Sequence, residues 1–213
     1  MDRRSFGLNA GAFALVAGAG VSGLARAQAA MPVEGHDYQT LDKPVAVPAS
    51  GKIEVLEFFW YGCPHCFAFE PVVGPWSLGL PADVHFSRVP VAFDARRELH
   101  QRIYYTWEAL GLVGQMHLKT FMRFHVQKKP IDSLADMQAF AQESGVDAEK
   151  VKSVWNSFSV QSRCLAAKRL EDDYSIDRTP EMAIAGRFVA MEVGNSRLLA
   201  TTDWLVDRVR RGG

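Results

Sequence analysis

Two cysteines separated by two residues, at the end of an apolar segment, constrain most strongly what this chain can fold into. The pair Cys63-Pro64-His65-Cys66 follows residues 53–61, an apolar run of β-branched and aromatic side chains with the pattern of a buried strand. Residues 67–70 have the pattern of a helix. The pair therefore lies at a strand-to-helix turn, where unpaired backbone N–H groups favour a thiolate at Cys63. Pro64 suits the first helical turn, because an N–H there has no intrahelical partner.

Other uses of two such cysteines fit the sequence less well. A closed zinc site needs four ligands, and the one further cysteine, Cys164, has no histidine close to it in sequence. A purely structural disulfide between Cys63 and Cys66 would close so short a loop that it constrains the unfolded chain little. The strand–turn–helix setting favours redox chemistry at the pair.

The residues around the pair carry a resemblance to a known family. The segment from Leu56 to Cys66, LEFFWYGCPHC, resembles the active site of the DsbA family of periplasmic thiol:disulfide oxidoreductases. The Pro-His dipeptide between the cysteines is similar to that family, whereas thioredoxin typically carries Gly-Pro. The resemblance extends over most of the chain after residue 27, and it implies an α/β, thioredoxin-like fold with an inserted all-helical domain.

The resemblance also implies roles for the four residues of the motif. Cys63 is expected to be the nucleophile that forms the mixed disulfide, and Cys66 the thiol that resolves it. His65 is expected to direct a hydrogen bond or a positive charge toward the Cys63 thiolate. Pro64 is expected to keep the turn tight.

An acid stands out in the apolar strand before the motif. Glu57 is costly to bury without a partner, and it resembles the buried acid of the DsbA and thioredoxin families, which places it among the expected catalytic residues. Arg88, on the following strand, is the expected partner, at a place where the family has a lysine. Glu54, by contrast, is expected at a solvated end of the strand.

A second motif lies far along the chain at Thr179-Pro180. In thioredoxin-like proteins a cis-proline loop faces the redox pair, and Thr179 and Pro180 resemble it in position and context. The residue before a proline favours extended backbone, so this loop is expected to bind an extended substrate. Arg178 stands where the family often has glycine. Cys164 is expected to pack on its helix as a small apolar residue.

The chain divides into four segments by composition and pattern. Residues 1–27 are expected to be a cleavable export signal, of the twin-arginine or the general secretory type, because Arg3-Arg4 precedes a mildly apolar stretch ending in Ala25-Arg26-Ala27. Residues 28–94 and 161–213 are expected to form the two parts of the thioredoxin-like domain. Residues 95–160 have helical periodicity throughout and form the expected helical insertion.

Several elements follow from local signals. Ser133 and Asp147 are expected to cap two helices of the insertion, the second of which directs Val151, Val154, Trp155 and Phe158 inward. Residues 181–190 predict a hairpin that turns at Ala185-Gly186, residues 45–47 a short edge strand, and Thr201 or Thr202 the start of the last helix.

The expected function is a periplasmic dithiol oxidase that donates its Cys63–Cys66 disulfide to reduced, unfolded exported proteins. The family resemblance implies a quinone-linked membrane partner of the DsbB type that reoxidises it, no metal or organic cofactor, and a monomer. A formal net charge of zero argues against a nucleic-acid surface. Two alternatives stay open: a thioredoxin-like reductase or isomerase, and a chaperone that binds a metal ion through Cys63 and Cys66.

Overall fold

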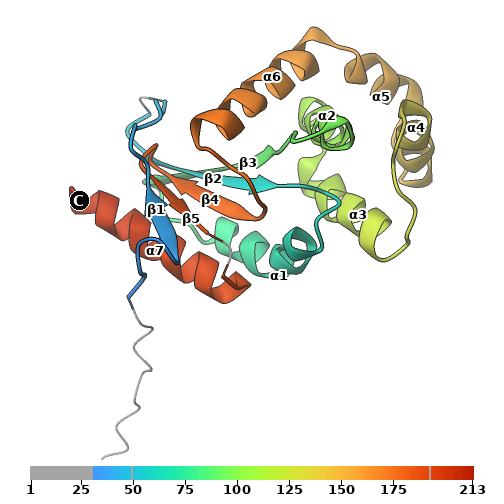
Figure 1. The fold of residues 1–213 in the computed structure, drawn as a ribbon. Coiled ribbons are helices and arrows are strands. Elements are labelled where there is room, and N and C mark those ends of the chain that lie inside the picture. The colour runs from blue at the N-terminus through green and yellow to red at the C-terminus, as the bar shows by residue number, and fades with distance from the viewer. Residues whose placement is uncertain (1–30, 49, 192) are drawn as a thin grey trace, which may run out of the picture. The chain divides into compact units, whose positions relative to one another are not determined.

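The chain folds around a five-stranded mixed sheet in a computed structural model that describes residues 31–48, 50–191 and 193–213 (Figure 1). The export signal expected at residues 1–27 lies outside the described residues. The strands are β1 Tyr38–Thr40, β2 Ile53–Phe59, β3 Val84–Pro90, β4 Glu181–Ile184 and β5 Phe188–Ala190.

The apolar segment before the cysteine pair is β2, an interior strand of the sheet. The strands lie in the order β1-β5-β4-β2-β3, with β2 parallel to β3 and antiparallel to β4. Each residue from Glu54 to Phe59 is buried, as expected for a strand covered on both faces. The cysteine pair therefore follows the C-terminal end of a buried interior strand.

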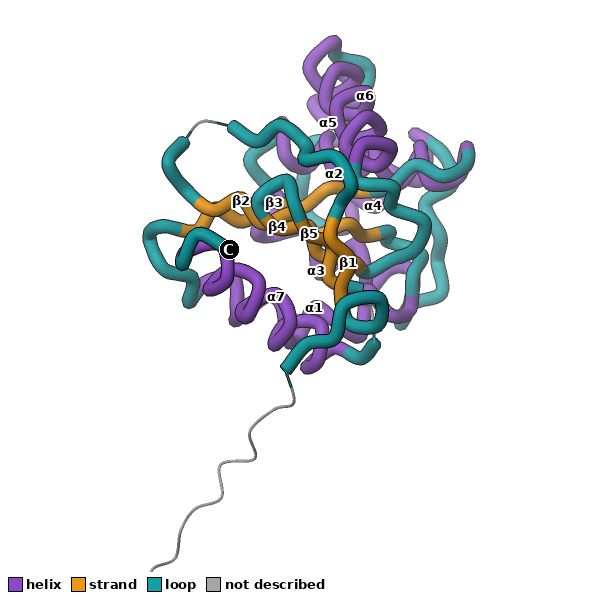
Figure 2. The backbone as a smooth tube through the Cα atoms, turned by 60° about the vertical axis from the view of Figure 1, so that its left-hand side comes forward, coloured by secondary structure: helices purple, strands orange, loops and turns teal. Residues whose placement is uncertain are grey.

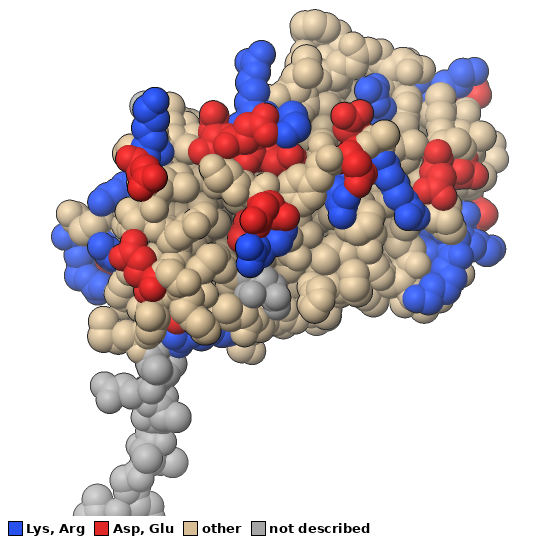
Figure 3. Space-filling model, in the orientation of Figure 1, with Lys and Arg blue, Asp and Glu red and all other residues tan. Residues whose placement is uncertain are grey.

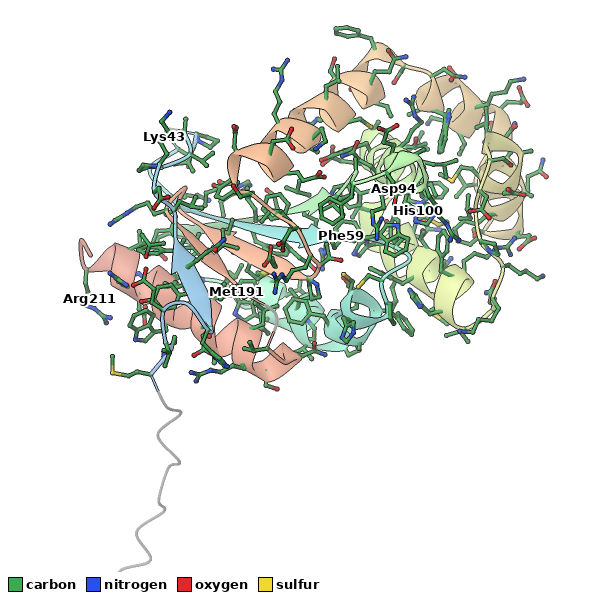
Figure 4. The ribbon with its side chains drawn as sticks, viewed as in Figure 1. Lys43, Phe59, Asp94, His100, Met191 and Arg211 are labelled. Atoms are coloured by element: carbon green, nitrogen blue, oxygen red, sulfur yellow. The ribbon has the colours of Figure 1, made fainter. Side chains whose placement is uncertain are left out.

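Helices cover the two faces of this sheet unequally. They are α1 Pro64–Leu78, α2 Ala95–Ala109, α3 Val113–His125, α4 Leu134–Glu143, α5 Ala148–Trp155, α6 Phe158–Asp173 and α7 Asn195–Arg210. In Figures 1 and 2, α1 and α7 lie together on one face of the sheet, and in Figure 1 α6 lies on the other, while α3 lies beside α1 beyond the ends of the strands. Phe59, labelled in Figure 4, lies where the two parts meet, with its ring against those of Tyr104 and Phe121.

The two caps expected in the helical insertion are present. The hydroxyl of Ser133 accepts a hydrogen bond from the backbone N–H of Asp136 at the start of α4. The carboxylate of Asp147 accepts from the N–H groups of Glu149 and Lys150 at the start of α5. Both side chains satisfy N–H groups that have no partner within their own helix.

The inward direction expected for Phe158 is wrong. Val151 and Trp155 are buried on α5, but the Phe158 side chain is 83% exposed. Ser157 interrupts the pattern, because its hydroxyl accepts from the N–H of Val160 and starts α6. Phe158 is thus the first residue of a new helix. The boundary proposed between residues 160 and 161 falls within α6 and stays a proposal.

The last helix begins earlier than expected. It starts at Asn195 after Gly194, which has a φ of 117° and offers no side-chain cap. Thr201 and Thr202 lie buried inside the helix, and the hydroxyl of Thr202 donates to the carbonyl of Leu198. A threonine that bonds back to its own helix gives the same local signal as an N-cap, which is why the sequence misplaced this start.

Two further expectations are corrected by tertiary contacts. Residues 45–47 form no strand; the N–H of Val45 donates to the carbonyl of Gly186, and the prolines at 44 and 48 limit further pairing. Glu54 is not solvated: it is 7% exposed, and His85 on β3 lies with Nδ1 2.9 Å from its carboxylate. The partner lies on the neighbouring strand, which the sequence alone did not reveal.

The surface carries charges of both signs. On the face drawn in Figure 3, acidic and basic side chains lie in small groups with uncharged surface between them. Within the residues that the structure describes, no helix has the length and apolar character needed to span a membrane.

The hairpin turn at Ala185-Gly186 yields a test of the fold. Gly186 has a φ of 68°, and a Cβ there would lie 2.1 Å from the carbonyl oxygen of Val45. Gly145 has a φ of 77° with nothing within 4 Å of its Cβ position. We expect Gly145→Ala to cost about 1–2 kcal/mol of unfolding free energy from backbone strain alone. Gly186→Ala should cost roughly 2–5 kcal/mol, because the clash adds to the strain. Urea unfolding of the two variants measures the difference, and equal costs would contradict the close approach of residue 45 to the turn.

Candidate active site

Cys63 and Cys66 occupy the first turn of α1, as the sequence predicted. Cys63 is the N-cap residue with extended backbone, and Pro64 is the first residue of the helix. Cys63 is 7% exposed and Cys66 is fully buried. Both are free thiols in this structure. The sulfur of Cys63 therefore lies close to the surface, whereas that of Cys66 is inaccessible to solvent.

The two thiols have opposite acidities. A hydrogen bond from Cys66 lowers the pKa of Cys63 to about 5; burial opposes this, and the Thr179 side chain and the backbone N–H groups of Cys66 and His65 add to it. Burial, together with its bond to Cys63, raises the pKa of Cys66 well above the ordinary value. In the reduced protein at neutral pH, Cys63 is a thiolate and Cys66 is a thiol.

The loop at Thr179-Pro180 lies against the redox pair. The Thr179–Pro180 peptide bond is cis, and Cys63 Sγ lies 3.4 Å from the carbonyl oxygen of Thr179. Both the cis bond and its place beside Cys63 agree with what the family resemblance implied. Arg178 is exposed and pairs with Asp177 at 2.7 Å, so its charge is already partnered at the edge of this loop.

His65 reaches Cys63 through its backbone. The side chain of His65 is exposed, whereas its N–H group is among those that lower the pKa of Cys63. The role expected for the imidazole ring stays a prediction. Pro64 is also exposed, next to the sulfur that a partner molecule would reach.

The expected pairing of Glu57 with Arg88 is confirmed. Arg88 Nε lies 2.9 Å from Glu57 Oε2, and the carboxyl is fully buried. Burial raises the pKa of Glu57 to about 7, and the charge of Arg88 only partly offsets it. Arg88 keeps its own proton, because a guanidinium does not titrate in this range. Glu57 is therefore the group of this pair that gains or loses a proton near neutral pH.

Two buried residues of this site were missed by the sequence reasoning. Glu70 on α1 lies with Oε2 3.5 Å from Arg88 Nη2 and with Oε1 2.9 Å from His117 Nε2. The hydroxyl of Tyr61 lies 2.9 Å from His117 Nδ1. Glu70 carried the same signal as Glu57, an acid within an apolar run. No local signal distinguished His117, because α3 brings it to α1 only in the folded chain.

A further buried acid follows the cis-proline. Glu181 is 3% exposed and lies 3.8 Å from the guanidinium of Arg178. Burial, with a contribution from the charge of Asp177, raises the pKa of Glu181 to about 8. Its carboxyl is therefore mainly protonated at neutral pH, and it adds little negative charge beside the loop.

Cys164 lies apart from these residues on α6. It is half-buried beside Gln101 and Arg102 of α2, and burial raises the pKa of its thiol to about 11. Such a thiol is unreactive at neutral pH. Among the described residues, no cluster of three or more histidine, cysteine or acidic side chains has the geometry to hold a metal ion.

Comparison with known proteins agrees with this geometry. A family model described as the DSBA-like thioredoxin domain matches residues 79–205. The thiol:disulfide interchange protein DsbA of Pseudomonas aeruginosa is 38% identical over 200 residues, which cover 92% of this chain and 94% of that protein. The DsbA protein of Burkholderia cepacia is 35% identical, with 89% of this chain and 91% of that protein covered.

Solved structures show the same fold. The crystal structure of Pseudomonas aeruginosa DsbA matches with a TM-score of 0.80 at 37% identity, over 83% of this chain and 93% of that chain. The oxidoreductase DsbA from Xylella fastidiosa matches with a TM-score of 0.80 at 29% identity, over 85% of this chain and 99% of that chain. With its Cys63–Cys66 pair and a thioredoxin-like fold that holds a helical insertion, this chain belongs to the DsbA family of thiol:disulfide oxidoreductases.

Proposed function

We propose that the protein is a periplasmic dithiol oxidase that donates its Cys63–Cys66 disulfide to newly exported proteins. The observation that carries this direction is the set of hydrogen-bonding groups around Cys63, which lowers its pKa to about 5. The donors that cause it stabilise a charge that exists only when the disulfide is open. Stabilising the reduced form makes the disulfide a stronger oxidant.

The reaction follows from the unequal acidities of the two sulfurs. A substrate thiolate attacks Cys63 Sγ, the Cys63–Cys66 bond breaks, and its electron pair goes to Cys66 Sγ, which takes up a proton. A second substrate thiolate then attacks the substrate sulfur of the mixed disulfide. Cys63 leaves as a thiolate, and the substrate is oxidised while the enzyme is reduced by two electrons.

The surroundings of the pair support roles for five further residues. Thr179 and Pro180 would hold the substrate backbone beside Cys63, and Pro64 would keep the turn tight. The ring of His65 would add positive charge near the departing thiolate. Glu57 would supply the proton that the buried Cys66 requires, because it is the acid with a pKa near 7 on the face of β2 that α1 covers.

The setting of the reaction belongs to the same proposal. A cleavable signal at residues 1–27 would export the chain, and a quinone-linked membrane partner of the DsbB type would return it to the oxidised form. The monomer would act through its own disulfide, without a metal or organic cofactor.

Substitution of the nucleophile tests the proposed chemistry. The oxidised protein should pass its disulfide to a reduced peptide with two cysteines. Cys63→Ser should lower the rate by about 10³-fold or more, since this variant can form no Cys63–Cys66 disulfide to transfer. The matched control is Cys164→Ser, which should act like the unmodified chain because that thiol lies apart from the redox pair. Peptide oxidation followed by mass spectrometry measures each rate.

Three results would count against the proposal. Disulfide transfer that persists in Cys63→Ser would contradict the assignment of Cys63 as the reactive cysteine. Rearrangement of a mispaired substrate that outpaces net oxidation would favour the isomerase. Metal bound in stoichiometric amount after aerobic purification, and lost in Cys63→Ser, would favour the metal-binding chaperone.

The charge on Cys63 also predicts how stability depends on pH. Its folded pKa of about 5 lies below the ordinary value of 9.0, so the reduced fold gains stability that is complete above pH 9 and is lost as the pH falls through 5. From pH 5 to pH 7, the unfolding free energy of the reduced form should rise relative to that of the oxidised form. After allowance for solvent screening, we expect this rise to be about 1–2 kcal/mol.

Urea unfolding of both redox forms across this pH range measures the gain. The Cys63→Ser variant, which cannot form the disulfide, is compared with the reduced unmodified chain and should lack the rise, because it has no thiolate at this position. A difference between the two redox forms that does not change from pH 5 to pH 7 would contradict a stabilised thiolate.

A further inference from the structure

Four ionisable side chains from four different elements meet inside the fold, and one of them, Glu70, lies one helical turn after Cys66 on the same face of α1. Glu57 comes from β2, Arg88 from β3, Glu70 from α1 and His117 from α3. Glu57 is fully buried, and Glu70 and His117 are 8% and 5% exposed. Charges that are this well removed from water must balance one another within the cluster.

The two carboxyl groups of the cluster share one cation. Arg88 places Nε 2.9 Å from Glu57 and Nη2 3.5 Å from Glu70. A single guanidinium neutralises one carboxylate, so the buried pair favours keeping one proton near neutral pH. The pair then titrates as a unit, and the local question is which carboxyl holds that proton.

Hydrogen bonds distinguish the two carboxyl groups. Glu70 Oε1 lies 2.9 Å from His117 Nε2. Neither oxygen of Glu57 has a hydrogen-bond partner among the described residues, although the ion pair with Arg88 is close. A donor to the charged form of a carboxyl favours that form. The arrangement therefore favours ionised Glu70 and protonated Glu57.

The state of Glu70 decides how the His117 ring uses its two nitrogens. Although burial opposes it, the hydrogen bond and the charge of His117 lower the pKa of Glu70. Burial lowers the pKa of His117 against the opposing effect of Glu70, so the ring is neutral at neutral pH. A neutral ring has one N–H. An ionised Glu70 can only accept, so Nε2 donates to it and Nδ1 accepts from the hydroxyl of Tyr61 at 2.9 Å.

We propose that His117 is a positioning residue that decides which carboxyl holds the shared proton. By donating to Glu70, it leaves the proton on Glu57, where Cys66 can take it when the disulfide opens. The Cys63–Cys66 bond breaks toward Cys66, and the Glu57 carboxyl becomes a carboxylate as the Cys66 thiolate becomes a thiol. The role of this proton rests on the proposed function; its placement on Glu57 does not.

The other groups that face Glu57 leave this balance in place. Burial raises the pKa values of Tyr104 on α2 and of Tyr61, so both are neutral at neutral pH. On β4 the residue paired with Glu57 is Met182, which carries no charge. Arg88 remains the cation on β3, and Glu70 and His117 are the groups contributed by α1 and α3.

Titration of the two carboxyl groups tests the proposal directly. Reduced protein with ¹³C-labelled glutamate side chains is followed by NMR from pH 4 to pH 9, and Glu57→Gln and Glu70→Gln assign the two signals. In the unmodified chain Glu70 should be ionised through the range in which Glu57 titrates. In His117→Phe, which removes the donor, the midpoint of Glu70 should rise and that of Glu57 should fall, each by about one pH unit or more.

Two matched variants separate the hydrogen bond from packing. His117→Gln keeps an N–H donor and should leave the proton on Glu57. Tyr61→Phe removes the other hydrogen bond of the ring and should leave the Glu70 midpoint in place. If His117→Phe does not fold, His117→Met removes the donor with a more adaptable apolar side chain. Unchanged midpoints in the folded donor-free variant would overturn the proposal, and so would a shift of the same size in His117→Gln.

Disulfide exchange shows whether the placement matters to the reaction. Mixed-disulfide formation at pH 7 should slow about tenfold in His117→Phe and recover in His117→Gln. An equal rate in the unmodified chain, His117→Phe and His117→Gln would contradict a role of His117 in the reaction rate. The titration would still show which carboxyl holds the proton. An unmodified chain that does not oxidise the peptide would refute the proposed function, and the titration would decide the proton placement separately.

Discussion

A negative charge on Cys63 needs hydrogen-bond donors, and the fold supplies them from two separate parts of the chain. The strand-to-helix turn contributes the Cys66 thiol and the N–H groups of residues 65 and 66, and the cis-proline loop contributes Thr179. These groups meet because β4, which begins just after the loop, pairs with β2, which ends just before the cysteines. The sheet is thus what places both halves of the site around one sulfur.

The second sulfur, that of Cys66, has the opposite requirement, because its negative charge has to be neutralised when the disulfide opens. Cys66 is fully buried, and its raised pKa means that opening the disulfide requires a proton there. The buried ionisable cluster of Glu57, Arg88, Glu70 and His117 holds the guanidinium of Arg88 between two acids. An arginine at this position keeps its own charge, which leaves the acids to exchange the proton. Hydrogen-bond donors therefore stabilise the negative charge on the sulfur of Cys63, whereas a buried acid supplies the proton that neutralises the sulfur of Cys66.

The sequence predicted the parts of this arrangement that local patterns specify. The buried strand, the helix after the cysteines and the caps at Ser133 and Asp147 follow from signals within short segments. The pairing of Glu57 with Arg88 was expected because the family has a lysine at the place of Arg88. The cis bond at Pro180 was predicted from the family resemblance rather than from local chemistry. His117 was missed because its meaning depends on α3 packing against α1, and Glu54 was misjudged because its partner lies on the adjacent strand.

The reduction potential of the Cys63–Cys66 pair tests the central claim most directly. The protein is equilibrated with mixtures of reduced and oxidised glutathione at pH 7, and the fraction of protein in each redox form is determined. A stabilised Cys63 thiolate predicts a value well above that of thioredoxin, about −270 mV, and toward the known value for DsbA, about −120 mV. A potential close to that of thioredoxin would mean that the donors around Cys63 do not favour the reduced form, and it would contradict the account of this protein as an oxidase.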